Sequence, residues 1–341
     1  MMRTIANVRM SSPYGTASGR LRNGGTTGEL RARSEGYGAP MRIGISGGAV
    51  NEGTIEQAID EARAVADAGL HAYWVSQIFG HDALTLLALV GREVPGIELG
   101  TAVVPTYPRH PMMLAQQALS VQSATGGRLS LGIGLSHKIV VESMWGLSFD
   151  KPVRHLREYL TVLMPLLEGS SVAHEGEEYR VHGAVSVPGG SRPSVLVAAL
   201  GSQMLRVTGA LADGTSTWCV GPKTLQQHTV PVLRQAAADA GRPEPRVCAA
   251  FPVCVTDDVD AARARAATVF AIYNQLPSYR TMMDIEGVEG PKDLAIVGTE
   301  AEVTDQLKEL AAIGVTDLNA GVFPGNPEEG ARTRAVLSSL V

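Results

Sequence analysis

Residues 129–138 read Leu-Ser-Leu-Gly-Ile-Gly-Leu-Ser-His-Lys, and this stretch decides the fold class. Its first part is an apolar run with small residues at alternate positions, which is typical of a buried parallel strand. Gly132 and Gly134 have no Cβ, so we expect the main chain there to approach a flat ligand closely. The strand then ends in a polar Ser-His-Lys. A buried strand that ends in Gly, Ser and His predicts the active-site edge of an α/β protein.

Outward from this stretch, strands alternate with helices along the chain. We expect eight strands, at residues 41–46, 72–76, 96–104, 128–133, 195–199, 214–218, 247–255 and 316–322. Helices are expected at 54–69, 82–91, 111–124, 152–168, 202–212, 223–239, 259–275, 300–313 and 328–340. Short crossovers of this kind make the strands parallel, and eight such units close into a TIM (β/α)8 barrel.

A helix-turn-strand module occurs near both ends of this pattern. Gly53-Thr54 is followed by Gly69, and Gly298-Thr299 is followed by Gly314, and in each case the second glycine comes sixteen positions after the first. Thr54 with Gln57 has the spacing of a capping box, and the later glycine is typical of a helix end. Such a repeat favours a closed ring of similar units.

The chain is expected to consist of an N-terminal extension and a barrel, and the barrel contains two further segments. Residues 1–40 are rich in Ser, Gly, Thr and Arg without periodicity, which predicts a disordered N-terminal extension. The barrel is expected to span 41–341. Within it, 171–193 has the pattern of a small inserted hairpin, and 276–298 is irregular and long enough to be a candidate lid.

Composition excludes several classes of function. The net charge is −5, basic residues are scattered and aromatic residues make up 5% of the chain, so no nucleic-acid surface is expected. No apolar run approaches the ~20 residues of a membrane span. Cys219, Cys248 and Cys254 have no metal-ligand spacing, and their odd number argues against a disulfide framework, which favours buried thiols in the cytoplasm.

The expected mouth of the barrel, at the carboxyl ends of the strands, is low in charge. It has no pair of carboxylates for glycoside chemistry and no histidine cluster for a metal. Residues 44–48 fit the GxSxG pattern of a serine hydrolase, but no helix cap follows before Thr54. The strand at 195–199 runs through Gly201 into a helix from Ser202, and such a helix start binds phosphate well. The pattern favours a bound cofactor that brings its own reactivity.

Five motifs together resemble the luciferase-like monooxygenase superfamily, and especially its branch that uses the deazaflavin coenzyme F420. They are Gly100-Thr-Ala-Val-Val-Pro105, Pro111-x-x-x-Ala115-Gln116, Gly127-Arg-x-x-Leu-Gly-Ile-Gly134, Ala198-Ala-Leu-Gly-Ser202 and Leu211-Ala-Asp-Gly214. Each motif alone is weak, whereas their order and spacing are fairly specific. The likeness covers about 41–341.

This resemblance implies a TIM barrel with an insertion, a cis peptide bond between Ala102 and Val103, and coenzyme F420 as cofactor, with FMN as the alternative. The coenzyme phosphate would lie at 201–204. The cofactor-binding residues would be Ser46, Ser76, Thr101, Ala102, Val103, Gly134, Leu135, Ser136, Gly201, Ser202, Gln203 and Met204. A small-molecule substrate and a homodimer are also expected.

Departures from the family pattern bear on the reaction. The sugar-phosphate dehydrogenases of the family carry Asp-His after the second strand and Glu after the fourth, where this chain has Gln77-Ile78 and His137. A sugar phosphate is therefore disfavoured. His137 is the candidate proton donor, because an imidazole titrates near neutral pH, or else a loop residue that holds the coenzyme. His81 is a second catalytic candidate.

The sequence thus predicts an oxidoreductase that transfers a hydride between F420 and a small organic substrate, with reduction of a C=N or C=C bond as the expected reaction. An FMN-dependent monooxygenase and a non-catalytic flavin-binding barrel are the alternatives.

Overall fold

Eight parallel strands form the closed barrel that the alternation predicts, in a computed structural model that describes residues 40–341. They are β1 (Arg42–Ser46), β2 (Ala72–Val75), β3 (Glu98–Thr101), β5 (Leu129–Gly134), β8 (Ser194–Val197), β9 (Gly214–Trp218), β10 (Arg246–Val255) and β12 (Asp317–Val322). Neighbours follow the order β10-β12-β1-β2-β3-β5-β8-β9, and pairing of β9 with β10 closes the ring. The expected extension over 1–40 lies, except for its last residue, outside the described residues.

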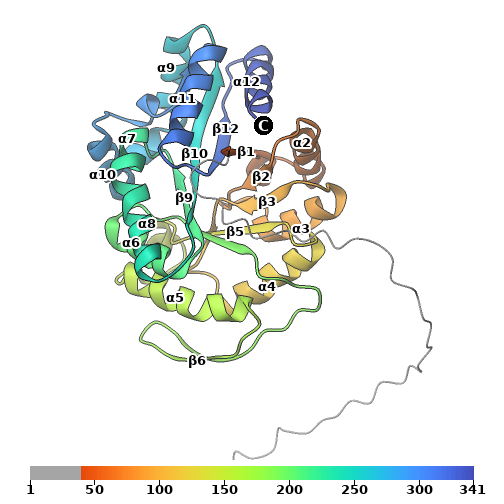
Figure 1. Cartoon of the computed structure of the whole chain (residues 1–341), viewed down its shortest axis with the longest axis vertical. Coiled ribbons are helices and arrows are strands. Elements are labelled where there is room, and N and C mark those ends of the chain that lie inside the picture. The colour runs from red at the N-terminus through yellow and green to blue at the C-terminus, as the bar shows by residue number, and fades with distance from the viewer. Residues whose placement is uncertain (1–39) are drawn as a thin grey trace, which may run out of the picture. The chain divides into compact units, whose positions relative to one another are not determined.

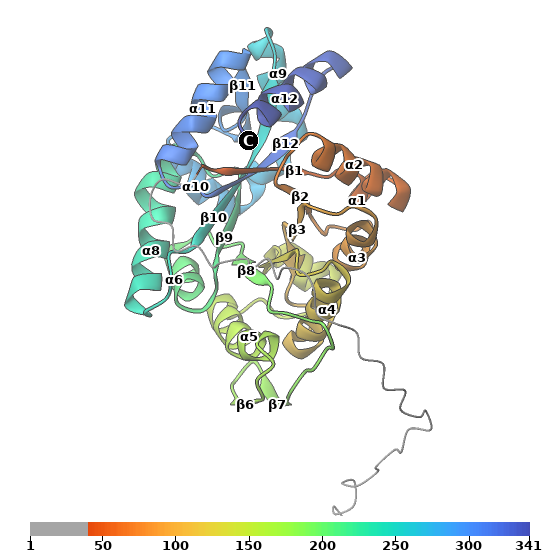
Figure 2. The ribbon, with the colours of Figure 1, turned by 45° about the vertical axis from the view of Figure 1, so that its right-hand side comes forward.

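Helices surround the barrel (Figures 1 and 2). The main ones are α2 (Ile55–Asp67), α3 (Ala83–Glu93), α4 (Pro111–Ala124), α5 (Pro152–Leu167), α6 (Ser202–Leu211), α8 (Val230–Asp239), α9 (Val259–Val269), α11 (Glu300–Ala312) and α12 (Pro327–Ser339). Thr54 and Thr299 each form a full capping box, with Gln57 and Glu302. The repeated module that the sequence indicates is therefore present at both ends of the barrel.

Smaller elements decorate this frame. They are α1 (Ala49–Glu52), β4 (Val104–Pro105), a π-helix at Val140–Met144, α7 (Pro222–Thr224), a π-helix at Leu225–Thr229 and a 3-10 helix at Ala271–Gln275. The expected hairpin is found as β6 (Val172–Glu175) paired antiparallel with β7 (Arg180–Gly183). The short α1 follows directly after Gly48, so a helix does start sooner than the sequence pattern indicates.

The prediction of an irregular segment at 276–298 is wrong. This segment holds α10 (Pro277–Glu286), a 3-10 helix (Pro291–Asp293) and β11 (Ile296–Gly298), which adds to β10 at the edge of the barrel. Proline opens α10, and Gly287 ends it with φ 85°. The Glu286 carboxylate accepts hydrogen bonds from the backbone N–H and the hydroxyl of Thr224, both at 2.7 Å. The helix is therefore anchored to α7.

Charged side chains fill the amino-terminal end of the barrel. Arg246 on β10 donates to Glu98 on β3 at 2.9 Å and to Asp317 on β12 at 2.7 Å. Arg42 on β1 contacts the same two carboxylates, at 2.9 and 3.2 Å. Because β10 and β3 lie on opposite sides of the ring, the contact between Arg246 and Glu98 crosses the interior. These four residues form a neutral, internally paired floor.

Trp74 lies in the interior of the barrel. It is fully buried and clusters with Leu196 and Cys248 from strands elsewhere in the ring. Gly44 and Gly100 on the neighbouring strands leave room for the indole, because a Cβ at Gly100 would lie 2.0 Å from the ring. The barrel is therefore filled below its mouth.

Candidate active site

Small side chains line the mouth of the barrel at the carboxyl ends of the strands. Strand alternation turns the same side of each strand inward. Trp218 of β9 lies beside Gly321 at this level, and the small inward residues nearest the mouth are Ser46, Ser76, Ala102, Gly134, Ala198 and Gly321. All except Gly134 are half-buried, whereas the interior below them is buried. These side chains therefore carry no charge, and five of the six are partly exposed to solvent.

Gly132 and Gly134 serve a bulge in the neighbouring strand. A Cβ at Gly132 would lie 1.9 Å from the carbonyl oxygen of Thr101, and one at Gly134 would lie 2.6 Å from a methyl of Val103. The space beside both glycines is therefore filled by protein. These glycines bring the main chain close to residues 101–103, and an approach of the same main chain to a ligand stays a prediction.

The bulge itself is well fixed. The Thr101 hydroxyl donates to the Gly132 carbonyl at 2.7 Å and accepts from the Gly132 N–H at 2.8 Å. Val75 accepts a hydrogen bond from the Ala102 N–H at 2.7 Å. The peptide bond between Ala102 and Val103 is cis, as the family resemblance implies. Ala102 and Val103 are half-buried at the mouth, whereas Thr101 is buried, which leaves the bulge rather than the threonine side chain to face a ligand.

Two non-glycine residues with left-handed backbone stand at the same end. Ser136 follows β5 with φ 61°, and Cys219 follows β9 with φ 48°. Such conformations are uncommon outside glycine and concentrate at functional sites. Their position supports the mouth as the active site.

His137 lies in the loop after β5 and is half-buried. Its ring contacts the ring of Tyr279, with 6.0 Å between centroids, and no hydrogen bond to its ring nitrogens is found within residues 40–341. Burial lowers the pKa of His137 below its usual value of 6.5. The imidazole is therefore neutral at pH 7 and has both ring nitrogens available.

His81 has a structural partner. Its Nε2 lies 3.0 Å from the carbonyl oxygen of Gly53, and its backbone N–H donates to Val50 at 2.8 Å. These contacts join the loop after β2 to the turn between α1 and α2. A catalytic role for His81 stays a prediction, and this geometry does not favour it.

Gln77, where the related dehydrogenases carry an acid, is part of a rim network. Its side-chain oxygen accepts from Arg109 at 3.0 Å, and Arg109 also pairs with Asp82 at 2.5 Å. The Tyr159 hydroxyl donates to the Arg109 carbonyl at 3.0 Å. Gln77 therefore fixes the loops after β2 and β4 to each other.

The start of α6 offers free backbone donors. Gly201 is its N-cap residue and provides no side chain to cap the first turn. A Cβ added at Gly201 would meet nothing within 4 Å, so the space before the helix is open. Gly201 and Gln203 are exposed, and Ser202 and Met204 are half-buried. Uncapped N–H groups beside open space are suited to a phosphate.

Aromatic residues that the sequence analysis largely missed form one side of the mouth. Trp218 contacts Tyr273 with ring centroids 5.9 Å apart, and Tyr273 contacts Tyr279 at 5.0 Å. Burial raises the pKa of Tyr273 to about 12, so its hydroxyl stays protonated. Tyr279 lies on α10, and the helical pattern of that segment is the feature of the sequence that could have indicated its position. Together with the contact between Tyr279 and His137, these rings form a continuous aromatic surface against which a flat organic molecule could stack.

These features fit a phosphate-bearing flavin or deazaflavin. The donors at the start of α6 suit the phosphate, and the small residues at the mouth leave room for a ring. Within the described chain, Trp74 Nε1 and Asn319 Oδ1 are buried without a hydrogen-bond partner. Both residues are buried below the mouth, so these two atoms are not evidence for a ligand.

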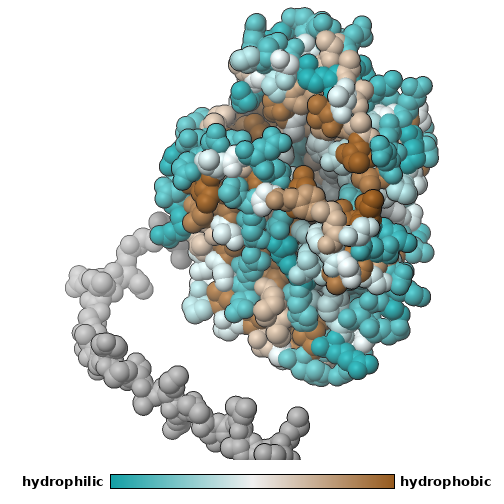
Figure 3. All heavy atoms as spheres, turned by 180° about the vertical axis from the view of Figure 1, so that it is seen from behind, coloured by the Kyte–Doolittle hydropathy of each residue, from teal (hydrophilic) through white to brown (hydrophobic). Residues whose placement is uncertain are grey.

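The described residues contain neither a metal cluster nor a membrane-spanning helix. Across residues 40–341, no group of three or more His, Cys, Asp or Glu side chains is placed to hold a metal ion. No helix in the same range has the length and apolar character needed to cross a bilayer. Apolar and polar residues are mixed on the face seen in Figure 3, with brown residues around a hollow in its upper half.

Comparison with known proteins gives one family. Residues 36–317 match the family described as luciferase-like monooxygenase. A putative coenzyme F420-dependent oxidoreductase of Mycobacterium tuberculosis is 25% identical over 303 residues, which cover 84% of this chain and 86% of that protein. A 5,10-methylenetetrahydromethanopterin reductase of Methanolobus tindarius is 25% identical over 300 residues, covering 79% and 91%.

Solved structures share the fold. The coenzyme F420-dependent tetrahydromethanopterin reductase of Methanopyrus kandleri matches with a TM-score of 0.71 and 21% identity, over 89% of this chain and 99% of that one. The oxygenating constituent of 3,6-diketocamphane monooxygenase of Pseudomonas putida, in complex with FMN, matches with a TM-score of 0.71 and 16% identity, over 89% and 98%. The two relatives bind different cofactors on one barrel architecture.

Proposed function

The chain belongs to the luciferase-like monooxygenase family, and we propose that it is an F420-dependent oxidoreductase that reduces a C=N or C=C bond of a small organic molecule. The uncapped, open start of α6 beside a small-residue mouth is the observation that carries this proposal. One 25%-identical relative is named a putative coenzyme F420-dependent oxidoreductase, which supports the deazaflavin rather than FMN. The methylenetetrahydromethanopterin reductases among its relatives support a carbon–nitrogen substrate.

Each part of the site has a task in this reaction. The first-turn amides of α6 would hold the coenzyme phosphate, and the bulge at 101–103 would support the ring. When bound, the deazaflavin supplies or accepts a hydride at carbon. The rings of Trp218, Tyr273 and Tyr279 exclude water from the site and position an apolar substrate.

In this proposal His137 donates and accepts the proton. In the reducing direction its protonated ring gives a proton to the substrate atom next to the carbon that gains the hydride, and in the reverse direction its neutral ring takes that proton back. Because burial lowers the pKa of His137, the neutral form dominates at pH 7. Reduction is therefore expected to be faster below neutral pH and oxidation faster above it.

The test is a titration of the purified protein with F420 and with FMN, followed by fluorescence. Saturable binding of F420 and turnover of an imine or enone panel with its reduced form are expected. Protein that retains FMN through purification and does not bind F420 would instead support the monooxygenase, and F420 binding without any turnover would support a non-catalytic barrel.

A further inference from the structure

Exposed apolar side chains gather beside the aromatic rings at the mouth. Among the described residues, ten large apolar side chains are exposed, and half of them lie in two short segments. One segment is the loop 139–149 after β5, and the other, 269–279, runs from the end of α9 into α10. The five side chains, which together we call the apolar rim, are Ile139, Met144, Leu147, Val269 and Ile272.

Charge is scarce in both segments. Glu142 is the only charged residue within 139–149 and 269–279, whereas charged residues make up 18% of the whole chain. Glu142 also pairs with Lys138 at 3.8 Å, so its charge is compensated nearby. Exposed apolar surface of this kind marks a place where a protein binds something. The scarcity of charge indicates an uncharged partner.

Ring contacts join the two segments to the proposed site. The ring of His137, just before the first segment, contacts the ring of Tyr279 in the second. Phe270 and Tyr273 both contact Trp218 at the end of β9, with 5.6 and 5.9 Å between centroids. The apolar rim is therefore the outward continuation of the aromatic surface at the mouth, and not a separate patch.

The loop after β5 is hydrogen-bonded to the candidate proton donor. The carbonyl oxygen of His137 accepts from the backbone N–H groups of Val140 and Val141, both at 2.9 Å. Val141 is buried, and its carbonyl accepts from the N–H of Leu147 at 3.0 Å. A molecule that lies on this loop is therefore held at a fixed place relative to His137.

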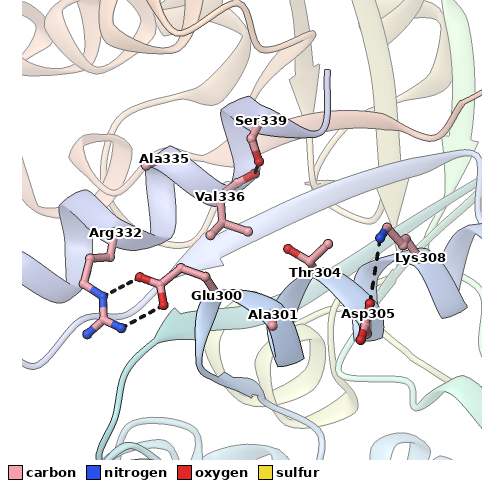
Figure 4. Close-up of a pocket in the computed structure, with 9 residues that line it drawn as sticks. All are labelled: Glu300, Ala301, Thr304, Asp305, Lys308, Arg332, Ala335, Val336 and Ser339. Carbon is pink, nitrogen blue, oxygen red and sulfur yellow. Dashed lines mark hydrogen bonds and ion pairs between the residues drawn. The ribbon is translucent and has the colours of Figure 1, made fainter.

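The groove between α11 and α12, with a volume of about 580 Å³, has a polar lining instead (Figure 4). Arg332 there pairs with Glu300 at 2.7 Å, and Lys308 pairs with Asp305 at 3.8 Å. Val336, the one large apolar residue of the lining, is buried. Exposed apolar side chains are thus a feature of the mouth and not of every hollow in the described chain.

Three kinds of occupant cover apolar side chains in proteins: a ligand, a membrane or a second copy of the chain. Membrane surfaces attract apolar residues that are flanked by free cations, and Lys138 beside the rim is already paired. A second copy seated on both segments would cover the mouth that a substrate has to reach. Continuity with the aromatic surface favours the molecule that reacts at the mouth.

We propose that the substrate carries an uncharged hydrocarbon part, an alkyl chain or fused rings, which lies on the apolar rim while the reducible bond lies beside His137. The proposal rests on the proposed function for the reducible bond, whereas the hydrocarbon part follows from the rim alone. Each methylene group removed from water strengthens binding about fourfold. A longer hydrocarbon part therefore binds more tightly as long as the rim covers it.

The experiment compares cyclohexenone with its butyl and octyl derivatives. Dissociation constants are measured by tryptophan fluorescence, since Trp145 lies within the first segment and Trp218 contacts the second. Turnover of the same three compounds with reduced F420 is measured separately. Binding and reaction are thus observed independently of each other.

The variant Ile139→Ser/Ile272→Ser removes one apolar side chain from each segment. The matched control is Leu89→Ser/Met113→Ser, which removes two exposed apolar side chains from α3 and α4. All four positions are exposed, so both variants should fold, and circular dichroism checks that they do.

The unaltered protein and the control should bind the octyl compound at least about tenfold more tightly than cyclohexenone. In the rim variant this ratio should shrink to about threefold or less, with turnover of cyclohexenone unchanged. Equal dissociation constants for the three compounds, or an equal loss in the control, would overturn the hydrocarbon site whichever coenzyme the enzyme uses. Tighter binding of the octyl compound without reduction of any compound by F420 would instead overturn the proposed function and leave the hydrocarbon site.

Two further measurements decide between the substrate and the other occupants. The proposal expects the rim variant to sediment like the unaltered protein, and neither to pellet with phosphatidylcholine vesicles. A dimer that Ile139→Ser/Ile272→Ser dissociates would place a second copy on the rim and overturn the proposal. Vesicle binding that the same variant abolishes would place a membrane there and overturn it as well.

Discussion

Replacing Gly132 by alanine tests why β5 carries glycine at this point. The added Cβ would lie 1.9 Å from the Thr101 carbonyl oxygen, where an ordinary contact needs 3.4 Å or more, so one backbone has to move by about 1.5 Å. The obstacle cannot rotate away, because it is main chain held by two hydrogen bonds between Thr101 and Gly132.

The cost follows from these contacts. Overpacking of this kind costs about 1–3 kcal/mol, and loss of two hydrogen bonds adds about 1 kcal/mol each. Alanine also lowers the conformational entropy of the unfolded chain, which offsets about 0.4–1 kcal/mol of this cost. We expect Gly132→Ala to lower the free energy of unfolding by about 3 kcal/mol, a large share of the roughly 5–15 kcal/mol of a typical domain.

Gly201→Ala is the matched comparison. Its backbone, at φ −75° and ψ 154°, accepts alanine, and the new Cβ would meet nothing within 4 Å. Stability should fall by about 1 kcal/mol at most, because alanine is a poorer N-cap residue than glycine but reduces the freedom of the unfolded chain. Coenzyme affinity should nevertheless fall about tenfold or more, because the methyl group enters the space before the free amides of α6.

Urea unfolding followed by circular dichroism, together with coenzyme titration, separates the two effects. The reasoning fails if Gly132→Ala keeps its urea midpoint yet loses the coenzyme, because that result would place the ligand, and not the Thr101 carbonyl, beside Gly132.

Three further changes test other parts of the structure. His137→Ala should reduce turnover at least about 100-fold, with the dissociation constant of the coenzyme unchanged. In the unaltered enzyme, the rate of substrate reduction should fall as the pH rises through the pKa of His137, which lies below 6.5. A rate that does not depend on pH would rule out His137 as the proton donor. Asp317→Ala should cost about 3–5 kcal/mol in urea unfolding because it leaves Arg246 buried without this partner. Burial raises the pKa of Asp317, but the attraction of Arg246 outweighs burial, so the pKa lies below its usual 3.8. The stabilisation by the Asp317 carboxylate is therefore fully present above pH 3.8 and is lost as the pH falls through the lowered pKa. Glu286→Gln should speed hydrogen exchange in α10 selectively, because Thr224 loses its charged acceptor; unchanged exchange would contradict the anchor.

Local signals made most of the frame predictable. The capping boxes at Thr54 and Thr299 and the proline that opens α4 act within one turn of chain, so the sequence contains their partners. The same kind of signal was present in α10, with proline at its start and Gly287 at its end, but its weak apolar pattern concealed the helix.

The site was less predictable because its contacts join distant strands. Nothing near Gly132 indicates that the carbonyl of Thr101 fills the space beside it, since the two residues meet only when β3 and β5 pair. The partner of His81 lies 28 residues away in the turn before α2. Burial and hydrogen bonding decide which loop polar groups are free, and both are properties of the folded chain.

The two ends of the barrel explain why the chemistry is confined to one of them. At the amino-terminal end, Arg42 and Arg246 neutralise Glu98 and Asp317, and these contacts across the interior close that end. Trp74 fills the space above them. The proposed ligand site therefore lies at the other end, where the small side chains and the uncapped start of α6 are found. Hydride transfer takes its reactivity from the cofactor and needs no charged side chain at the reacting carbon, so an uncharged mouth with a half-buried imidazole beside it is consistent with redox chemistry. The same mouth is poorly suited to hydrolysis, which needs a pair of carboxylates.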